Sequence, residues 1–321
     1  MPLPDTAPRA PLPDTAPRAP LSRAASGGLC AAAAMTVLGC STGATAGLTD
    51  YPLYGGQGVR YLLAAALLLP LARRCGPLRP RLRRGELTRL VLLAATGLFA
   101  FNVLLIQALR RTDPAAVGSV VGCTPLLLAV LGPLLARRRP QVRLLTAAGV
   151  VVAGAAVTQG FGPGEPVGFL FAVGTLACEA AFSLLAVSVL PRLGPVRVSA
   201  YTTALAVPMF GLTGLALEAG RLLRVPTAGE AAALLYLAIP LTVAAFLLWY
   251  TALGRLGPER AGLFAGLLPV TATLSGAALG TGGLHPGELL GSGLVGLGVC
   301  VGLTARQEPR PADPVAVPAA R

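Results

Sequence analysis

Lysine is missing from the sequence, so its 26 basic residues are all arginines. The phosphate-binding motif G-x-x-x-x-G-K-[ST] needs a lysine, so nucleotide-driven transport would require a separate subunit. Histidine occurs once, at His285, and the six cysteines form no C-x-x-C pair, so the sequence shows no recognisable metal site or catalytic triad. We therefore expect no cofactor, no metal and no enzyme, with a membrane-embedded enzyme as the weaker alternative.

Charged residues are also scarce. They make up 12% of the 321 residues, whereas soluble proteins contain roughly 25%. Hydrophobic residues reach 54%, in runs of about 20, which is long enough for a helix to cross the hydrocarbon core of a membrane. The runs predict an all-α integral membrane protein with ten transmembrane helices, near 28–48, 52–72, 90–109, 114–136, 143–160, 166–189, 196–217, 230–253, 257–280 and 286–304. The first run would also suit a cleaved signal peptide.

The net charge of +13 would suit a nucleic-acid binder, but the positions of the arginines favour another explanation. Most lie in the two tails or in alternate connections, such as 73–89 and 137–143. By the positive-inside rule, these connections and both termini face the cytoplasm, while 160–166 and 281–285 face outward. We predict a multi-pass protein of the plasma membrane, with the lipid bilayer as a partner and no nucleic acid, and we leave a homodimer open.

Both tails have a composition typical of disorder. The segment PLPDTAPRA occurs twice in succession, at 2–10 and 11–19, and the end of the chain is similarly rich in proline. Such stretches carry too little apolar surface to fold. We predict disordered tails at 1–27 and 306–321.

One segment of the sequence occurs in two similar copies. ALRRTDPAAVGSVVGCTP at 108–125 is matched by ALGRLGPERAGLFAGLLP at 252–269, and between 108 and 157 fourteen of fifty residues are identical to those 144 positions later. This offset divides the chain into two five-helix repeats, 28–160 and 161–305. Five crossings force the second repeat to enter from the opposite side, so the repeats are inverted, as in many secondary transporters.

Both copies keep the pattern G-x-x-x-G-x-x-P, as Gly118, Gly122 and Pro125 and as Gly262, Gly266 and Pro269. Small residues four apart allow helices to approach closely in lipid. Each proline lacks an N–H and frees the carbonyl four residues earlier, at Val121 or Ala265. We predict that the matched prolines form hinges or line a cavity at mid-depth, although membrane helices also tolerate glycine and proline without a function.

Three segments carry a family resemblance: RYLLAAALLLPLARR, LLIQALRRTDPAAVGSVVGCTPLLLAVLGPLL and LLWYTALGRLGPERAGLFAGLLPVTATLSG. They resemble the drug/metabolite transporter superfamily, in particular its EamA-type ten-helix members. The resemblance implies a carrier that moves small-molecule substrates, often outward. A membrane scaffold or receptor that transports nothing is the alternative.

Glu179 is the deepest charged residue of the predicted spans, and Thr175 and Ser183, four residues to either side, share its helix face. A charge at that depth costs roughly 2.5–3.5 kcal/mol on insertion scales and usually faces a cavity or a partner. Two roles stay open for Glu179: proton coupling, or a structural hydrogen bond between helices.

Arg60 falls inside the second span, where it needs an anion. An anionic substrate, Glu179 and Asp50 are the three candidates. Asn102 and Gln107 could bond a substrate, although a bond to a neighbouring helix is the favoured role for each. Trp249 and Tyr250 are expected to anchor the membrane interface.

Overall fold

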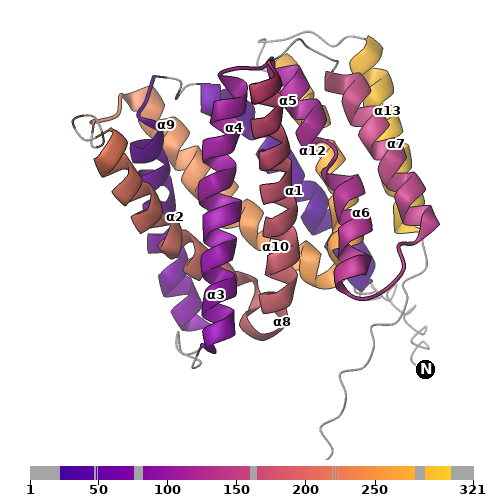
Figure 1. Ribbon diagram of the computed structural model, residues 1–321, viewed down its shortest axis with the longest axis horizontal. Helices are drawn as coiled ribbons and strands as arrows, with labels where there is room; N and C mark the ends of the chain where they lie inside the picture. The colour runs from indigo at the N-terminus through magenta and orange to yellow at the C-terminus, as the bar shows by residue number, and fades with distance from the viewer. Residues whose placement is uncertain are drawn as a thin grey trace, which may run out of the picture.

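The computed structural model describes residues 22–46, 48, 50–75, 82–159, 165–218, 220, 222, 224–278 and 286–304, and all their regular secondary structure is helical. The helices pack side by side as one bundle (Figure 1). Among these residues, six helical segments are long and apolar enough to cross a membrane, and two shorter apolar helices, 142–158 and 289–303, accompany them. This confirms the predicted all-helical class. Most of both predicted tails, and His285, lie outside the described residues.

The helices follow in chain order. In the first half they are α1 Arg23–Ala46, α2 Leu53–Arg74, α3 Arg84–Leu93, η1 Ala94–Ala100, α4 Phe101–Leu109, α5 Pro114–Val121, α6 Thr124–Leu135 and α7 Val142–Gln159. In the second half they are α8 Pro166–Leu217, α9 Ala228–Tyr236, η2 Leu237–Ala244, α10 Ala245–Leu256, α11 Pro258–Leu263, η3 Phe264–Gly266, α12 Leu267–Ala278 and α13 Pro286–Leu303. The segments η1 and η2 are π-helices, and η3 is a 3₁₀-helix.

Two helices begin earlier than their apolar runs predicted. α1 starts at Arg23 rather than near 28, because the Ser22 hydroxyl accepts a hydrogen bond from the Ala25 N–H at 3.2 Å. α3 starts at Arg84 rather than near 90, and there the Glu86 carboxylate accepts the Arg83 N–H at 2.9 Å. Hydropathy marks where an apolar run begins, whereas a polar cap allows the helix to begin one or two turns before that run.

The spans predicted at 166–189 and 196–217 are joined in the continuous helical segment α8, which is interrupted only at Gly194, with φ 74° and ψ 165°. Gly257 between α10 and α11 has nearly the same conformation, with φ 79° and ψ 165°. In both places a proline follows as the first residue of the next helix. Glycine accepts the positive φ and proline pre-sets a helix start, so each connection needs a single residue.

The bounds of the helices recur at the offset of 144 residues. α3 and α9 begin at 84 and 228, α7 and α13 span 142–159 and 286–303, and η1 at 94–100 corresponds to η2 at 237–244. π-helices are rare and occur often at functional sites. The backbone therefore repeats well beyond the 108–157 segment in which the sequence similarity is visible.

The most extensive helix pairing in the described part of the chain joins α7 to α13 at one edge of the bundle (Figure 1). A Cβ atom added to Gly154 would lie 2.7 Å from the Gly291 carbonyl oxygen, and one added to Gly291 would lie 2.5 Å from that of Gly154. At the centre, α1 packs against α10 and α12. The outer surface carries exposed leucines, among them Leu135, Leu212 and Leu290, which suit contact with lipid tails.

Candidate functional site

A cavity of about 1110 Å³ lies among α1, α2, η1, α4, α8, η2 and α10. Four residues predicted from the sequence line it together: Arg60, Asn102, Glu179 and Ser183. From mid-helix, the cavity extends to the chain segments at the ends of α1, α4 and α8, which we call the mouth and define by Asp50, Arg110, Glu218 and Gly220.

Arg60 on α2 is buried, with 8% of its surface exposed. Its Nε donates to Thr242 Oγ1 at 2.7 Å, its Nη1 donates to Gln57 Oε1 at 3.3 Å, and its guanidinium lies 5.0 Å from the ring centroid of Tyr61. Neither Glu179 nor Asp50 forms an ion pair with it among the described residues. Of the three candidate partners, the two protein carboxylates are thus not the ones that Arg60 binds.

The π-helix η2 presents Thr242 to Arg60. The Thr242 hydroxyl donates to the carbonyl oxygen of Leu237, five residues earlier, at 2.8 Å, and so can accept from Arg60 Nε. Leu237 and Leu241 of the same π-helix line the cavity. The sequence signal for Thr242 was a hydroxyl at mid-span in an otherwise apolar run, and sequence reasoning missed it.

The side-chain amide nitrogen of Asn102, on α4, donates hydrogen bonds to other groups of the protein. Nδ2 donates to the carbonyl oxygen of Leu98 at 2.6 Å and to the Tyr61 hydroxyl at 3.1 Å. The favoured expectation, a bond to a neighbouring helix, agrees with the contact to Tyr61 on α2. Because Asn102 also lines the cavity, its carbonyl oxygen remains the atom with which it could meet a ligand.

Glu179 on α8 meets the broken helix of the first repeat. Thr124 Oγ1 lies 2.9 Å from Glu179 Oε2 and 2.7 Å from the carbonyl oxygen of Val121, which Pro125 leaves without its helical N–H. A hydroxyl has one proton to donate. An ionised Glu179 and the Val121 carbonyl therefore compete for it, whereas a protonated Glu179 can donate to Thr124 while Thr124 donates to Val121.

The two hydroxyl residues beside Glu179 differ. Ser183 lines the cavity, and its buried Oγ has no hydrogen-bond partner among the described residues. Thr175 is fully buried and donates to the carbonyl oxygen of Phe171 at 2.9 Å, one turn back on its own helix. Ser183 thus offers a polar atom to a ligand, and Thr175 is outside the cavity wall.

The remaining predicted residues lie away from the described wall of this cavity. Gln107 accepts a hydrogen bond from Arg111 Nη1 at 2.6 Å near the end of α4. The glycines and prolines of the repeated motif, Gly118, Gly122, Pro125, Gly262, Gly266 and Pro269, are also absent from the wall. Both motif helices are nevertheless interrupted just before the proline, at 122–123 and at 264–266. The hinge role of these residues stays a prediction.

Aromatic rings form one wall of the cavity. The ring centroids of Phe182 and Phe246 lie 5.5 Å apart, and Phe182 lies 5.3 Å from Tyr250. Trp249 and Tyr250 are buried, and Trp249 lines the cavity, so the expectation that they anchor the membrane interface is wrong. Gly97 in η1 admits Phe182, since a Cβ there would lie 2.3 Å from its ring.

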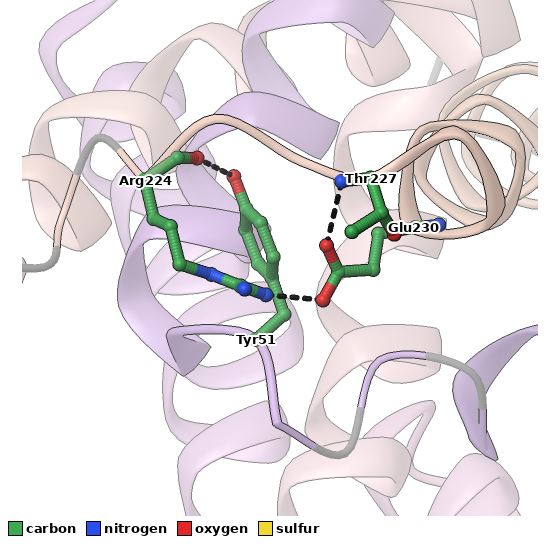
Figure 2. A network of polar contacts seen from close by, with 4 residues as sticks. All are labelled: Tyr51, Arg224, Thr227 and Glu230. Carbon is green, nitrogen blue, oxygen red and sulfur yellow. Dashed lines mark hydrogen bonds and ion pairs between the residues drawn. The ribbon is translucent and has the colours of Figure 1, made fainter.

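The mouth is held by a polar network. Glu218 Oε2 accepts the N–H groups of Tyr54 and Gly55, at 3.1 and 3.0 Å, and so caps the start of α2. Beside it, the Tyr51 hydroxyl donates to the Arg224 carbonyl oxygen at 2.7 Å, and the Arg224 guanidinium lies over the Tyr51 ring and pairs with Glu230 (Figure 2). Burial raises the pKa of Tyr51, which keeps its hydroxyl a donor.

Comparison with known proteins agrees with this architecture. Residues 25–159 and 166–304 each match the EamA-like transporter family. Two Bacillus subtilis (strain 168) proteins are similar: Uncharacterized transporter YetK, 28% identical over 77% of this chain and 78% of its own, and Uncharacterized transporter YyaM, 25% identical over 80% and 88%. A solved crystal structure shares the fold, with TM-score 0.72 and 20% identity over 86% of this chain and 96% of that chain.

Proposed function

The chain belongs to the EamA-like transporter family, and on that premise we propose that it is a secondary transporter of small metabolites working by alternating access between two inverted repeats. The substrate would bind in the cavity among Arg60, Asn102, Glu179 and Ser183. Similar carriers often move metabolites outward, and we propose export as its direction.

Ten crossings in two groups of five are the arrangement that we propose, with repeats at 28–160 and 161–305. Its support is the recurrence of helix bounds at the offset of 144, with Gly194 dividing α8 into two crossings. An odd number of crossings per repeat inverts the second copy. Paired, oppositely oriented gates then follow from the duplication itself.

We propose that both termini face the cytoplasm in the plasma membrane, following the arginine positions. The mouth of the cavity would then open to the outside. At the opposite end, Glu86 pairs with Arg192, and Arg138 lies 3.5 Å from Glu259, which links the segment after α6 to α11. These pairs would hold the cytoplasmic gate closed in this outward-open state.

Proton coupling through Glu179 is the third part of the proposal, and the observation that carries it is the position of Thr124 between Glu179 and the interrupted helix at Pro125. Protonation or deprotonation of Glu179 would change whether the Thr124 hydroxyl donates to Val121 or to Glu179. It would therefore change whether the Val121 carbonyl at the proposed hinge has a hydrogen-bond donor. The other titratable residues lining the cavity are Asp50, Tyr51, Arg60, Tyr61, Arg110 and Glu218.

Alternating access can be tested before the substrate is known. Leu105→Cys in a cysteine-free background puts one thiol in the cavity wall. In proteoliposomes, a membrane-impermeant reagent should label it from either side, in proportions that shift with pH. Labelling from one side only, at every pH, would refute alternating access, and comparing the metabolites of cells with and without the protein would then identify substrate candidates.

A further inference from the structure

The charge of Arg60 has no anion to neutralise it among the described residues. Its three recorded contacts are with the Thr242 hydroxyl, the Gln57 side-chain oxygen and the Tyr61 ring, and none of these carries a charge. No described group accepts a hydrogen bond from its Nη2, and the residue lines the cavity. An arginine inside a membrane protein is costly and pairs with an anion or marks a substrate path.

The acidic residues of the same cavity are engaged elsewhere or lie at its mouth. Glu218 is held by two backbone N–H groups of α2, and Glu179 by the Thr124 hydroxyl. Asp50 is exposed at the mouth. The deep, partly satisfied guanidinium is therefore the strongest recognition element for a ligand, and the forked geometry of its remaining donors suits a carboxylate.

Apolar surface surrounds this guanidinium. Phe101, Phe182, Phe246 and Trp249 line the cavity with leucines from α1, α4 and η2. Pockets of 300–1000 Å³ take up most of a small organic molecule, and this volume of about 1110 Å³ is slightly larger. A simple inorganic anion would leave most of these rings without a contact.

We propose that the cavity binds an organic carboxylate with an apolar or aromatic body, and that Arg60, oriented by Thr242 and Gln57, holds its carboxylate. Naming this molecule as the transported substrate rests on the transport function proposed above. The binding site itself is a separate claim, because it depends on the cavity and on Arg60 alone.

Trp249 gives a direct readout of binding, since it is the only tryptophan in the sequence and it lines the cavity. The purified protein in detergent would be titrated with 3-phenylpropionate, with its neutral isostere 3-phenylpropanamide and with 3-phenylpropylamine while Trp249 fluorescence is recorded. Charge-assisted hydrogen bonds to the guanidinium should make the carboxylate bind at least about tenfold more tightly than the amide. Equal binding of the three probes would overturn the proposal.

Arginine variants test which residue binds the carboxylate of the probe. Arg60→Gln should abolish the preference for the carboxylate, whereas Arg255→Gln, which removes the same charge from an exposed position outside the cavity wall, should keep it. Arg60→Lys retains a cation in the fold, should keep a reduced preference, and decides the matter if Arg60→Gln does not fold. A preference that survives unchanged in Arg60→Gln or Arg60→Lys refutes the assignment. Binding without any transport in proteoliposomes would instead refute the transport proposal and leave the anion site standing.

Discussion

Replacing the two matched prolines tests whether the interrupted helices act as gates. Pro125→Ala and Pro269→Ala each return a backbone N–H to a motif helix, where it can bond the carbonyl four residues earlier. The added bond straightens one helix and stabilises whichever facing state has that helix straighter. In inverted repeats the two helices serve opposite gates, so the two substitutions should bias the protein in opposite directions.

The structure predicts that the two substitutions change the ratio of the facing states by different amounts. A backbone hydrogen bond contributes about 0.5–1.5 kcal/mol net, which changes the ratio of two states about two- to tenfold. In the first repeat the Val121 carbonyl already accepts from Thr124 at 2.7 Å, so the new amide competes with an existing bond. In the second repeat the position equivalent to Thr124 is Leu268, which has no hydroxyl. Pro269→Ala should therefore shift the ratio up to tenfold, and Pro125→Ala only about twofold.

The assay compares labelling of Leu105→Cys from each side of proteoliposomes for single and double proline variants, with thermal stability measured in parallel. The double variant should return partway toward the original ratio. Adding Thr124→Val to Pro125→Ala removes the competing hydroxyl and should raise its shift toward that of Pro269→Ala. Bias in the same direction from both prolines, or none in stably folded protein, would refute the hinge.

Three further predictions concern coupling, topology and packing. Glu179→Gln should fold normally and make transport independent of pH; an unchanged pH profile in proteoliposomes would make Glu179 structural. Single cysteines placed in 82–89 should resist an impermeant reagent in intact cells, and their labelling would overturn the proposed topology. Gly154→Leu should destabilise the protein by about 1–3 kcal/mol through overpacking against α13, measured by thermal denaturation. Gly149→Leu, with no atom within 4 Å of its added Cβ, is the control and should stay near wild type.

The class of fold could be predicted from the sequence because lipid imposes a strong rule: long apolar runs must be helical. The π-helices could not be predicted, since the sequence signal is only Gly97 in 94–100 and Pro240 in 237–244, and neither residue distinguishes a π-helix from a kinked α-helix. Helix starts were misjudged where caps such as Ser22 and Glu86 lie outside the apolar run. The single-residue turn at Gly194 was taken for a longer connection, although the same L-G-P triplet stands at 256–258.

For the cavity, sequence analysis identified the charged and strongly polar residues, whose burial costs much free energy, and missed the threonines, whose burial costs little. Arg60, Glu179 and Asn102 could be selected because charged or strongly polar groups within a span need a reason. Thr124 and Thr242 escaped because a threonine in a membrane helix commonly bonds its own backbone. Their contacts to Glu179 and Arg60 depend on the separate helices α8 and α2, and a single sequence does not reveal such pairings.

The two repeats agree in backbone and disagree in the side chains that face the cavity. Shifted by 144, Arg60 corresponds to Ala204, Asn102 to Phe246, Glu179 to Met35, Ser183 to Gly39 and Thr242 to Leu98. The π-helices and the broken motif helices, in contrast, recur in both copies. The proposed exchange between two facing states would require both halves to deform in similar ways, which would explain why these backbone elements occur twice. Recognition of one asymmetric anion requires that each polar group occur once, because a second guanidinium would compete for the ligand's carboxylate and a second carboxylate would repel it. We therefore expect that restoring symmetry at Met35, which lines the cavity, by Met35→Glu would place a second carboxylate near the anionic ligand and weaken its binding, as Trp249 fluorescence would show.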